Sequence, residues 1–150
     1  MSVLIQDLVV AVRDDLALTP GIRLSTGYDN LTEAINEFPL VQVYPESGEV
    51  AHRSRTDRTT FGAVLRQEQM VLHVDVFAQQ RFDMAHDMMA VIDVADAVRA
   101  RLESHAETPP FGVTGVDTWR WTWTRVIFEY GDPRTQYVGI RFILSFTMHN

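Results

Sequence analysis

The segment DMAHD at residues 83–87 is the group best spaced for chemistry in this 150-residue sequence. Asp83, His86 and Asp87 are three and four residues apart, so on a helix they would share one face and could hold a divalent ion. A simpler interpretation is that Asp83 caps a helix, Asp87 suits the positive end of its dipole, and His86 is solvated. We favour the second interpretation and predict no metal site.

The segment HVD at residues 73–75 places an imidazole and a carboxylate two residues apart on an expected strand. No serine or metal partner is indicated nearby, so two polar side chains on a solvated face explain the pattern. The sequence also contains no glycine-rich phosphate loop, no GxSxG elbow and no HExxH helix. We therefore expect no catalytic group and no cofactor.

Composition narrows the class of protein. Hydrophobic residues make up 46% of the chain, which suits a single globular domain over residues 1–150. The net charge of −7 gives no general attraction to nucleic acid, and the absence of cysteine excludes disulfides and thiolate metal sites. No apolar run approaches the roughly 18 residues of a membrane span, and Asp7 interrupts the apolar start, so we expect a cytoplasmic chain without a signal peptide.

The segment RSRTDR contains the only local basic cluster, formed by Arg53, Arg55 and Arg58. It lies in a charged stretch, residues 46–62, whose lack of periodicity predicts a long exposed loop. The arginines could contact phosphate or an acidic neighbour, although nearby acidic residues favour a solvated loop. We group Arg66, just beyond the loop, with these three as candidate contacts to another subunit or a partner.

Hydrophobic periodicity predicts the elements of the first half. A helix capped by Ser2 ends at TPG (19–21), and its apolar face comprises Leu4, Ile5, Leu8, Val9, Val12 and Leu16. Asn30 and Glu33 have the spacing of a capping box, which predicts a short helix over 30–38. A short strand over 40–44 should end at Pro45. Strict alternation then predicts a long strand over 64–79, with Met70, Leu72, Val74 and Val76 on one side.

The second half is predicted to be one helix and a long hairpin. Asp83 should cap a helix that runs to Glu103, with one apolar face comprising Met84, Met88, Ile92, Ala95, Val98 and Leu102. Two strands, over 116–130 and 135–149, should follow and be joined by the turn-forming quartet GDPR. The complete pattern predicts an α+β fold, an antiparallel sheet of about four strands flanked by an N-terminal helix and a central helix.

The segment TWRWTWTR places three tryptophans at every second position of an expected strand. Pairing residue 130 with 135 puts all three opposite apolar residues, whereas a shift by one residue would divide the apolar face. We interpret the row as the floor beneath the central helix, with a subunit contact or a ligand platform as alternatives. The predicted core comprises Trp119, Trp121, Trp123, Phe142, Leu144, Phe146, Met88 and Ile92.

The order of elements resembles a known family. An N-terminal helix, a strand with VQVYP, a charged loop, the strand MVLHVDVFAQ, a helix and a hairpin ending in YVGIRFILSFTMHN are similar to tail terminator proteins of long-tailed bacteriophages and gene transfer agents. The resemblance covers nearly the whole chain in element order and length, although no invariant motif carries it. It implies an α+β antiparallel fold and a homo-hexameric ring that caps the head-proximal end of the tail tube.

The resemblance also implies partners and a location. The ring would contact the tail tube protein and a head connector protein, DNA would pass through its lumen without specific binding, and no membrane would be involved. The protein would be assembled in the host cytoplasm and reside in the virion. Two alternatives stay open: a head-completion or neck protein, and a small α+β enzyme or ligand-binding domain using a polar sheet face comprising Arg120, Thr122, Thr124, Arg141 and Ser145.

Overall fold

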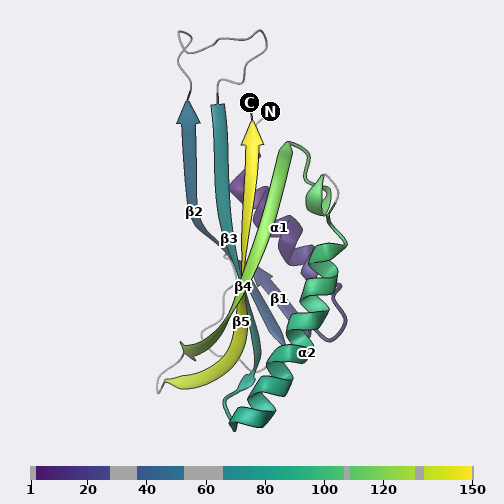
Figure 1. Cartoon of the computed structure of the whole chain (residues 1–150), viewed down its shortest axis with the longest axis vertical. Helices are drawn as coiled ribbons and strands as arrows, with labels where there is room; N and C mark the ends of the chain where they lie inside the picture. Colours follow the sequence, from purple (N-terminus) through teal and green to yellow (C-terminus); the bar gives the residue numbers. More distant parts are fainter. Residues whose placement is uncertain (1–2, 28–36, 53–65, 107–108, 131–133, 150) are drawn as a thin grey trace.

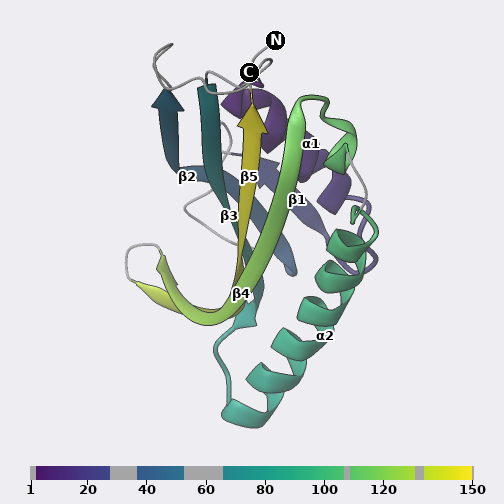
Figure 2. The same cartoon turned by 45° about the horizontal axis from the view of Figure 1, so that its top comes forward.

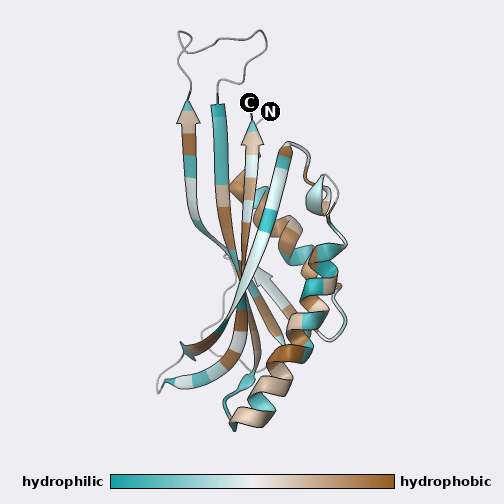
Figure 3. Cartoon of the chain, in the orientation of Figure 1, coloured by the Kyte–Doolittle hydropathy of each residue, from teal (hydrophilic) through white to brown (hydrophobic). Residues whose placement is uncertain are grey.

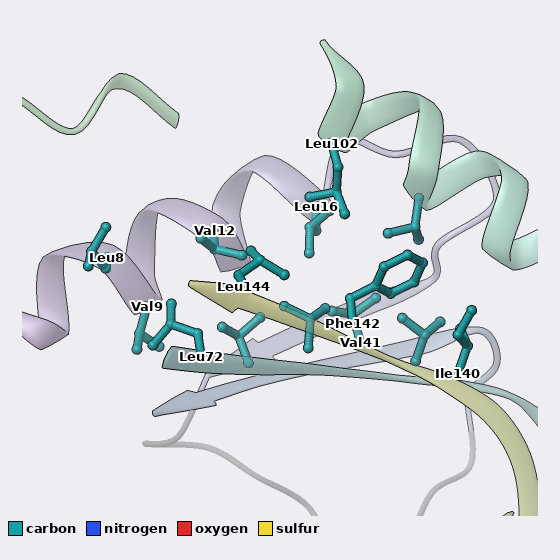
Figure 4. Packing of buried hydrophobic residues seen from close by; sticks show 14 of the residues in the cluster. Leu8, Val9, Val12, Leu16, Val41, Leu72, Leu102, Ile140, Phe142 and Leu144 are labelled. Atoms are coloured by element: carbon teal, nitrogen blue, oxygen red, sulfur yellow. The ribbon is translucent and has the colours of Figure 1, made fainter. Parts of the chain in front are cut away.

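The computed structural model describes residues 3–27, 37–52, 66–106, 109–130 and 134–149. These residues form a five-stranded sheet with the order β1-β2-β3-β5-β4, and two α-helices lie on one side of it (Figures 1 and 4). The α+β class is therefore confirmed. The elements in chain order are α1 (Ile5–Leu16), β1 (Leu24–Gly27), β2 (Leu40–His52), β3 (Arg66–Gln80), α2 (Met84–Glu103), the short 3-10 helix η2 (Pro110–Gly112), β4 (Val116–Tyr130) and β5 (Thr135–His149).

Helix α1 packs on the sheet with the apolar face that its periodicity predicts. Its buried residues are Leu8, Val9, Val12 and Leu16. The expected cap at Ser2 is wrong, because the helix begins at Ile5 and its N-cap residue is Leu4, which has an extended backbone and makes no side-chain capping bond. Leu4 and Ile5 are exposed, since they precede the turns that reach the sheet. Neither of the two long helices in the described part of the chain could span a membrane.

Strand β2 is longer than the sequence indicates. It continues through Pro45 to His52, and its register against β3 shifts between Pro45 and Ser47, so the proline occupies an irregular position where its missing N–H is tolerated. The first part of the expected 46–62 loop is therefore strand. Residues 53–65 lie outside the described residues, as does most of the expected helix over 30–38. Strand β1, which pairs in parallel with β2, has only four residues, too few to produce a recognisable alternation.

The register of the C-terminal hairpin is confirmed. Trp119 faces Phe146, Trp121 faces Leu144 and Trp123 faces Phe142, and β5 also pairs with β3 in antiparallel fashion. The alternation on β3 and β5 directs one apolar side chain in two toward the helices. Figure 4 shows this core between α1, α2 and the strands, including Leu72, Ile140, Phe142 and Leu144.

Helix α2 begins where the sequence predicts but presents a different face to the sheet. Asp83 is the N-cap and its side chain accepts a hydrogen bond from the backbone N–H of His86 at 2.9 Å. The buried residues are Asp87, Val91, Val94, Val98 and Leu102. Apolar residues occur around much of this helix (Figure 3), so periodicity alone could not select the packed side. Ile92, expected in the core, is 51% exposed, and Met88, also expected there, is only partly buried. Met84, on the expected apolar face, is 81% exposed.

Burial of the tryptophan row decreases along β4. The indole N–H of Trp119 donates to the carbonyl of His105 at 3.0 Å, and its ring stacks on Phe146 with centroids 5.9 Å apart. Trp121 is also partly buried against the core. Trp123, however, is 53% exposed, so its placement in the core is wrong. The physical reason is that α2 packs on β3 and β5, which leaves the edge strand β4 with little cover at this position.

A second, smaller core lies on the sheet face that the helices leave free. It comprises Leu40, Phe77, Phe128 and Tyr137, and it forms where the end of the β4–β5 hairpin curls away from α2 (Figure 2). Gly139 makes this packing possible. A Cβ atom at that position would lie 2.0 Å from the backbone oxygen of Val76 and 2.8 Å from the Phe128 ring. The absent side chain therefore lets the aromatic ring cross the strand closely.

Candidate assembly surfaces

The DMAHD segment forms a helix cap and an internal anchor. The Asp83 carboxylate accepts from the backbone N–H and contacts Nδ1 of His86, and these hydrogen bonds, the backbone one first, lower the pKa of Asp83. Asp87 is buried instead and accepts from the Gln79 side chain at 2.8 Å and from the Phe82 N–H at 3.0 Å. His86 is thus exposed to solvent, whereas Asp87 points into the protein, so the two side chains do not share a site. Within the described residues, no group of three His, Asp or Glu side chains could hold a metal ion.

The HVD segment is not solvated as expected, because Asp75 is only 1% exposed. Its carboxylate accepts from Nε of Arg141 at 2.7 Å, from Nη2 of the same residue at 3.1 Å, and from the Tyr44 hydroxyl at 2.7 Å. These hydrogen bonds raise the pKa of Arg141, against the opposing effect of its partial burial. The guanidinium also lies 5.7 Å from the centre of the Phe128 ring.

The remaining imidazole of that segment takes no part in this cluster. Nδ1 of His73 lies 3.6 Å from the Glu46 carboxylate, too far for a hydrogen bond, and its ring meets Tyr44 edge-on. Asp75 and His73 share the Tyr44 side chain as a neighbour but have no hydrogen bond to each other, so they do not form a catalytic relay. The Tyr44–Asp75–Arg141 cluster joins β2, β3 and β5 on the face away from the helices, and all of its charge is internally paired.

The polar face considered for a ligand-binding domain is only partly assembled. Arg120 and Ser145 line one depression of about 320 Å³ together with Thr118 and Thr147. Thr122, Thr124 and Arg141 do not line it, and Arg141 is held by Asp75. This arrangement lacks the buried, convergent polar groups that characterise small-molecule sites.

An exposed apolar groove lies between the start of α2 and the second half of β4, and we call it the α2–β4 groove. It has a volume of about 170 Å³, and Arg81, Asp83 and Arg125 contribute to its polar boundary. Phe82 is 76% exposed there. Its apolar lining comprises Phe82, Met84, Met88, Val91, Val126, Ile127 and Val138. Exposed apolar groups bordered by charges are typical of protein interaction surfaces.

The candidate basic contacts are only partly described. Arg53, Arg55 and Arg58 lie outside the described residues. Arg66 is the first residue of β3, and its guanidinium contacts the Glu68 carboxylate at 2.6 Å. It lines a broad depression between the start of α1 and the middle of β2, together with Leu4, Ile5, Pro45 and Met70.

Two stretches of the sheet's edges have no partner strand among the described residues. β1 pairs with β2 only at residues 40–43, so among the described residues the β2 edge is open over residues 45–52, and β4 is the last strand at the other end of the sheet. Neither the open edges nor the Asp75–Arg141 pair was expected from the sequence. The occurrence of Asp75 on the same strand face as Phe77 was the available signal, because it indicated a face that is not uniformly solvated.

Comparison with known proteins adds no relative. No model of a known protein family matches the chain, and no curated protein matches it.

Proposed function

We propose that this chain is a structural virion protein, six copies of which form a ring that caps the head-proximal end of a phage-type tail tube. The ring stops polymerisation of the tube and offers its other end to a head connector protein. The observation that carries the proposal is the pair of open edges at opposite ends of one sheet, since a ring needs two different surfaces on each subunit that meet head to tail.

Two further features support a ring with distinct surfaces. Both α-helices lie on one side of the sheet, so neighbouring copies related by rotation would place all helices on the same side of the ring wall. The chain has a net charge of −7, and an acidic lumen would let DNA pass without being held. The role requires no catalytic group, because capping depends only on contacts.

Electron microscopy of the protein mixed with tail tubes tests the proposal. The tubes would be assembled from the tube protein of the same virus-like particle, and tubes without added protein would serve as the control. We expect a ring of six 17.1-kDa chains, about 103 kDa in total, at one end of each tube, and elongation should stop at that end. Decoration along the tube's sides would refute the role. Binding only to filled heads would instead favour a neck protein.

A further inference from the structure

The two open edges are oriented so that they can pair between copies. β2 is antiparallel to β3, β3 to β5, and β5 to β4, so β4 runs opposite to β2. Figure 1 shows these two strands at the two ends of the upper part of the sheet, pointing in opposite directions. When copies are related by rotation about an axis along the strands, the β4 edge of one copy therefore meets the β2 edge of the next in antiparallel fashion.

The open edges have opposite charges at the same height of the sheet. Ser47 pairs with Val71, Val71 with Ser145, and Ser145 with Arg120, so Ser47 and Arg120 are level on opposite edges. Ser47 lies between Glu46 and Glu49, both exposed.

The side chains at this height are also available for contact. Neither Arg120 nor Glu49 forms an ion pair with any residue in the described ranges. Glu49 pairs with Gln69 on β3, and Gln69 shares a sheet face with Val71, so Glu49 and Arg120 lie on the face away from the helices. Long side chains at diagonal positions of neighbouring strands are within reach of each other.

We infer that neighbouring copies of the ring join by strand addition: the first half of β4 of one copy pairs with residues 46–52 of β2 of the next, and Arg120 contacts Glu49. The inference rests on the proposed ring. Main-chain hydrogen bonds hold the two edges together, and the charge pair selects their register. A single chain cannot satisfy this contact internally, because the two edges lie at opposite ends of its own sheet.

The same edges have features that restrict pairing in the free protein. Pro45 and the adjacent register shift interrupt the β2 edge, and exposed charges occur along β4. Such features weaken edge-to-edge association of a sheet. The contact is consequently weak for an isolated pair of copies and becomes effective when the end of a tube holds several copies close together.

Charge reversal tests the pairing. Glu49→Arg and Arg120→Glu should each lower ring occupancy at tube ends by about tenfold, which corresponds to about 1.4 kcal/mol for the lost attraction and the new repulsion together. Combining both substitutions in one chain should restore occupancy, because every contact then has the reversed pair. Arg99→Glu, an exposed change on α2 away from both edges, is the matched control and should have no effect.

Cross-linking tests the contact independently of the tubes, since the chain has no cysteine of its own. The double variant Ser47→Cys/Arg120→Cys should oxidise to a ladder of covalent multimers in concentrated solution and at tube ends, because level positions on paired strands satisfy disulfide geometry. Asp93→Cys/Arg120→Cys is the control that should give no ladder.

The outcomes separate the two proposals. The strand pairing would be overturned, and the capping role left intact, if sixfold rings form at tube ends but the cysteine variant gives no ladder and the double charge reversal gives no rescue. A wild-type protein that ignores tubes while the cysteine variant gives a ladder in solution would support the pairing and refute the capping role.

Discussion

Substitution of Arg141 by methionine should strongly destabilise the protein, because it removes the cation from a buried carboxylate. Asp75 is 1% exposed and has three hydrogen bonds, two of them from Arg141. In the Arg141→Met variant only the bond from the Tyr44 hydroxyl remains. The carboxylate would then be buried without a neutralising partner.

The size of the expected stability loss follows from how deeply Asp75 and Arg141 are each buried. Breaking a buried ion pair by removing one partner costs about 3 to 5 kcal/mol. The Arg141 side chain is 29% exposed, so water already reaches part of the guanidinium and the lower end of that range applies. A loss of about 3 kcal/mol in the free energy of unfolding corresponds to a melting temperature lower by about 6 to 12 °C for a chain of this size.

Urea unfolding followed by tryptophan fluorescence measures the loss, and the companion variant Asp75→Leu/Arg141→Met supplies the control. Replacing both charges with apolar groups should recover most of the stability, because no unpaired charge is then buried. A loss below about 1 kcal/mol in the single variant would refute the reasoning, since that value is typical of an exposed pair.

Three further predictions concern backbone packing, the tryptophan row and the helix cap. Gly139→Ala should lower the free energy of unfolding, measured in urea, by about 3 kcal/mol or more, because the new Cβ atom would lie 2.0 Å from a backbone oxygen. Gly48→Ala is the control: its Cβ atom would be 3.5 Å from the nearest atom, so stability should change by less than about 0.5 kcal/mol. Trp121→Ala should lower the free energy of unfolding by about 2 kcal/mol. Trp123→Phe should leave stability nearly unchanged and should remove the tryptophan emission that is most accessible to aqueous quenchers. Equal quenching of the wild-type and Trp123→Phe proteins would contradict this. Asp83→Ala should destabilise the protein at pH 7. Because the folded pKa of Asp83 lies below its ordinary value of 3.8, the wild-type advantage is present above that value and disappears as the pH falls through the folded pKa, so a pH-independent difference would exclude the cap.

The C-terminal hairpin could be predicted from sequence because two independent alternations agree on one register. Apolar residues occupy every second position on β5, and the tryptophans do so on β4, so only one pairing unites them. The α2 face could not be predicted in the same way. Apolar residues lie on more than one side of this helix, and the choice between Ile92 and Val91 depends on where the helix crosses the sheet.

The sheet face away from the helices shows a different limit of sequence-based prediction. The pairing of Asp75 with Arg141 depends on β5 lying next to β3, and strand order is not contained in the periodicity of either strand. The continuation of β2 through Pro45 could not be predicted either, because a proline in a sequence normally indicates the end of a strand. The two open edges follow from strand order and from this continuation of β2, so they could not be recognised in the sequence.

The position of the two open edges at opposite ends of one sheet has a consequence for mixtures of chains. If copies join into the proposed ring, a copy whose β4 edge is blocked would still offer an intact β2 edge, so it would enter a growing ring and prevent its closure. With equal amounts of blocked and intact chains, random mixing would leave about one sixfold ring in sixty-four free of defective copies. An equal amount of such chains would therefore act as a dominant inhibitor of assembly without any loss of folded protein.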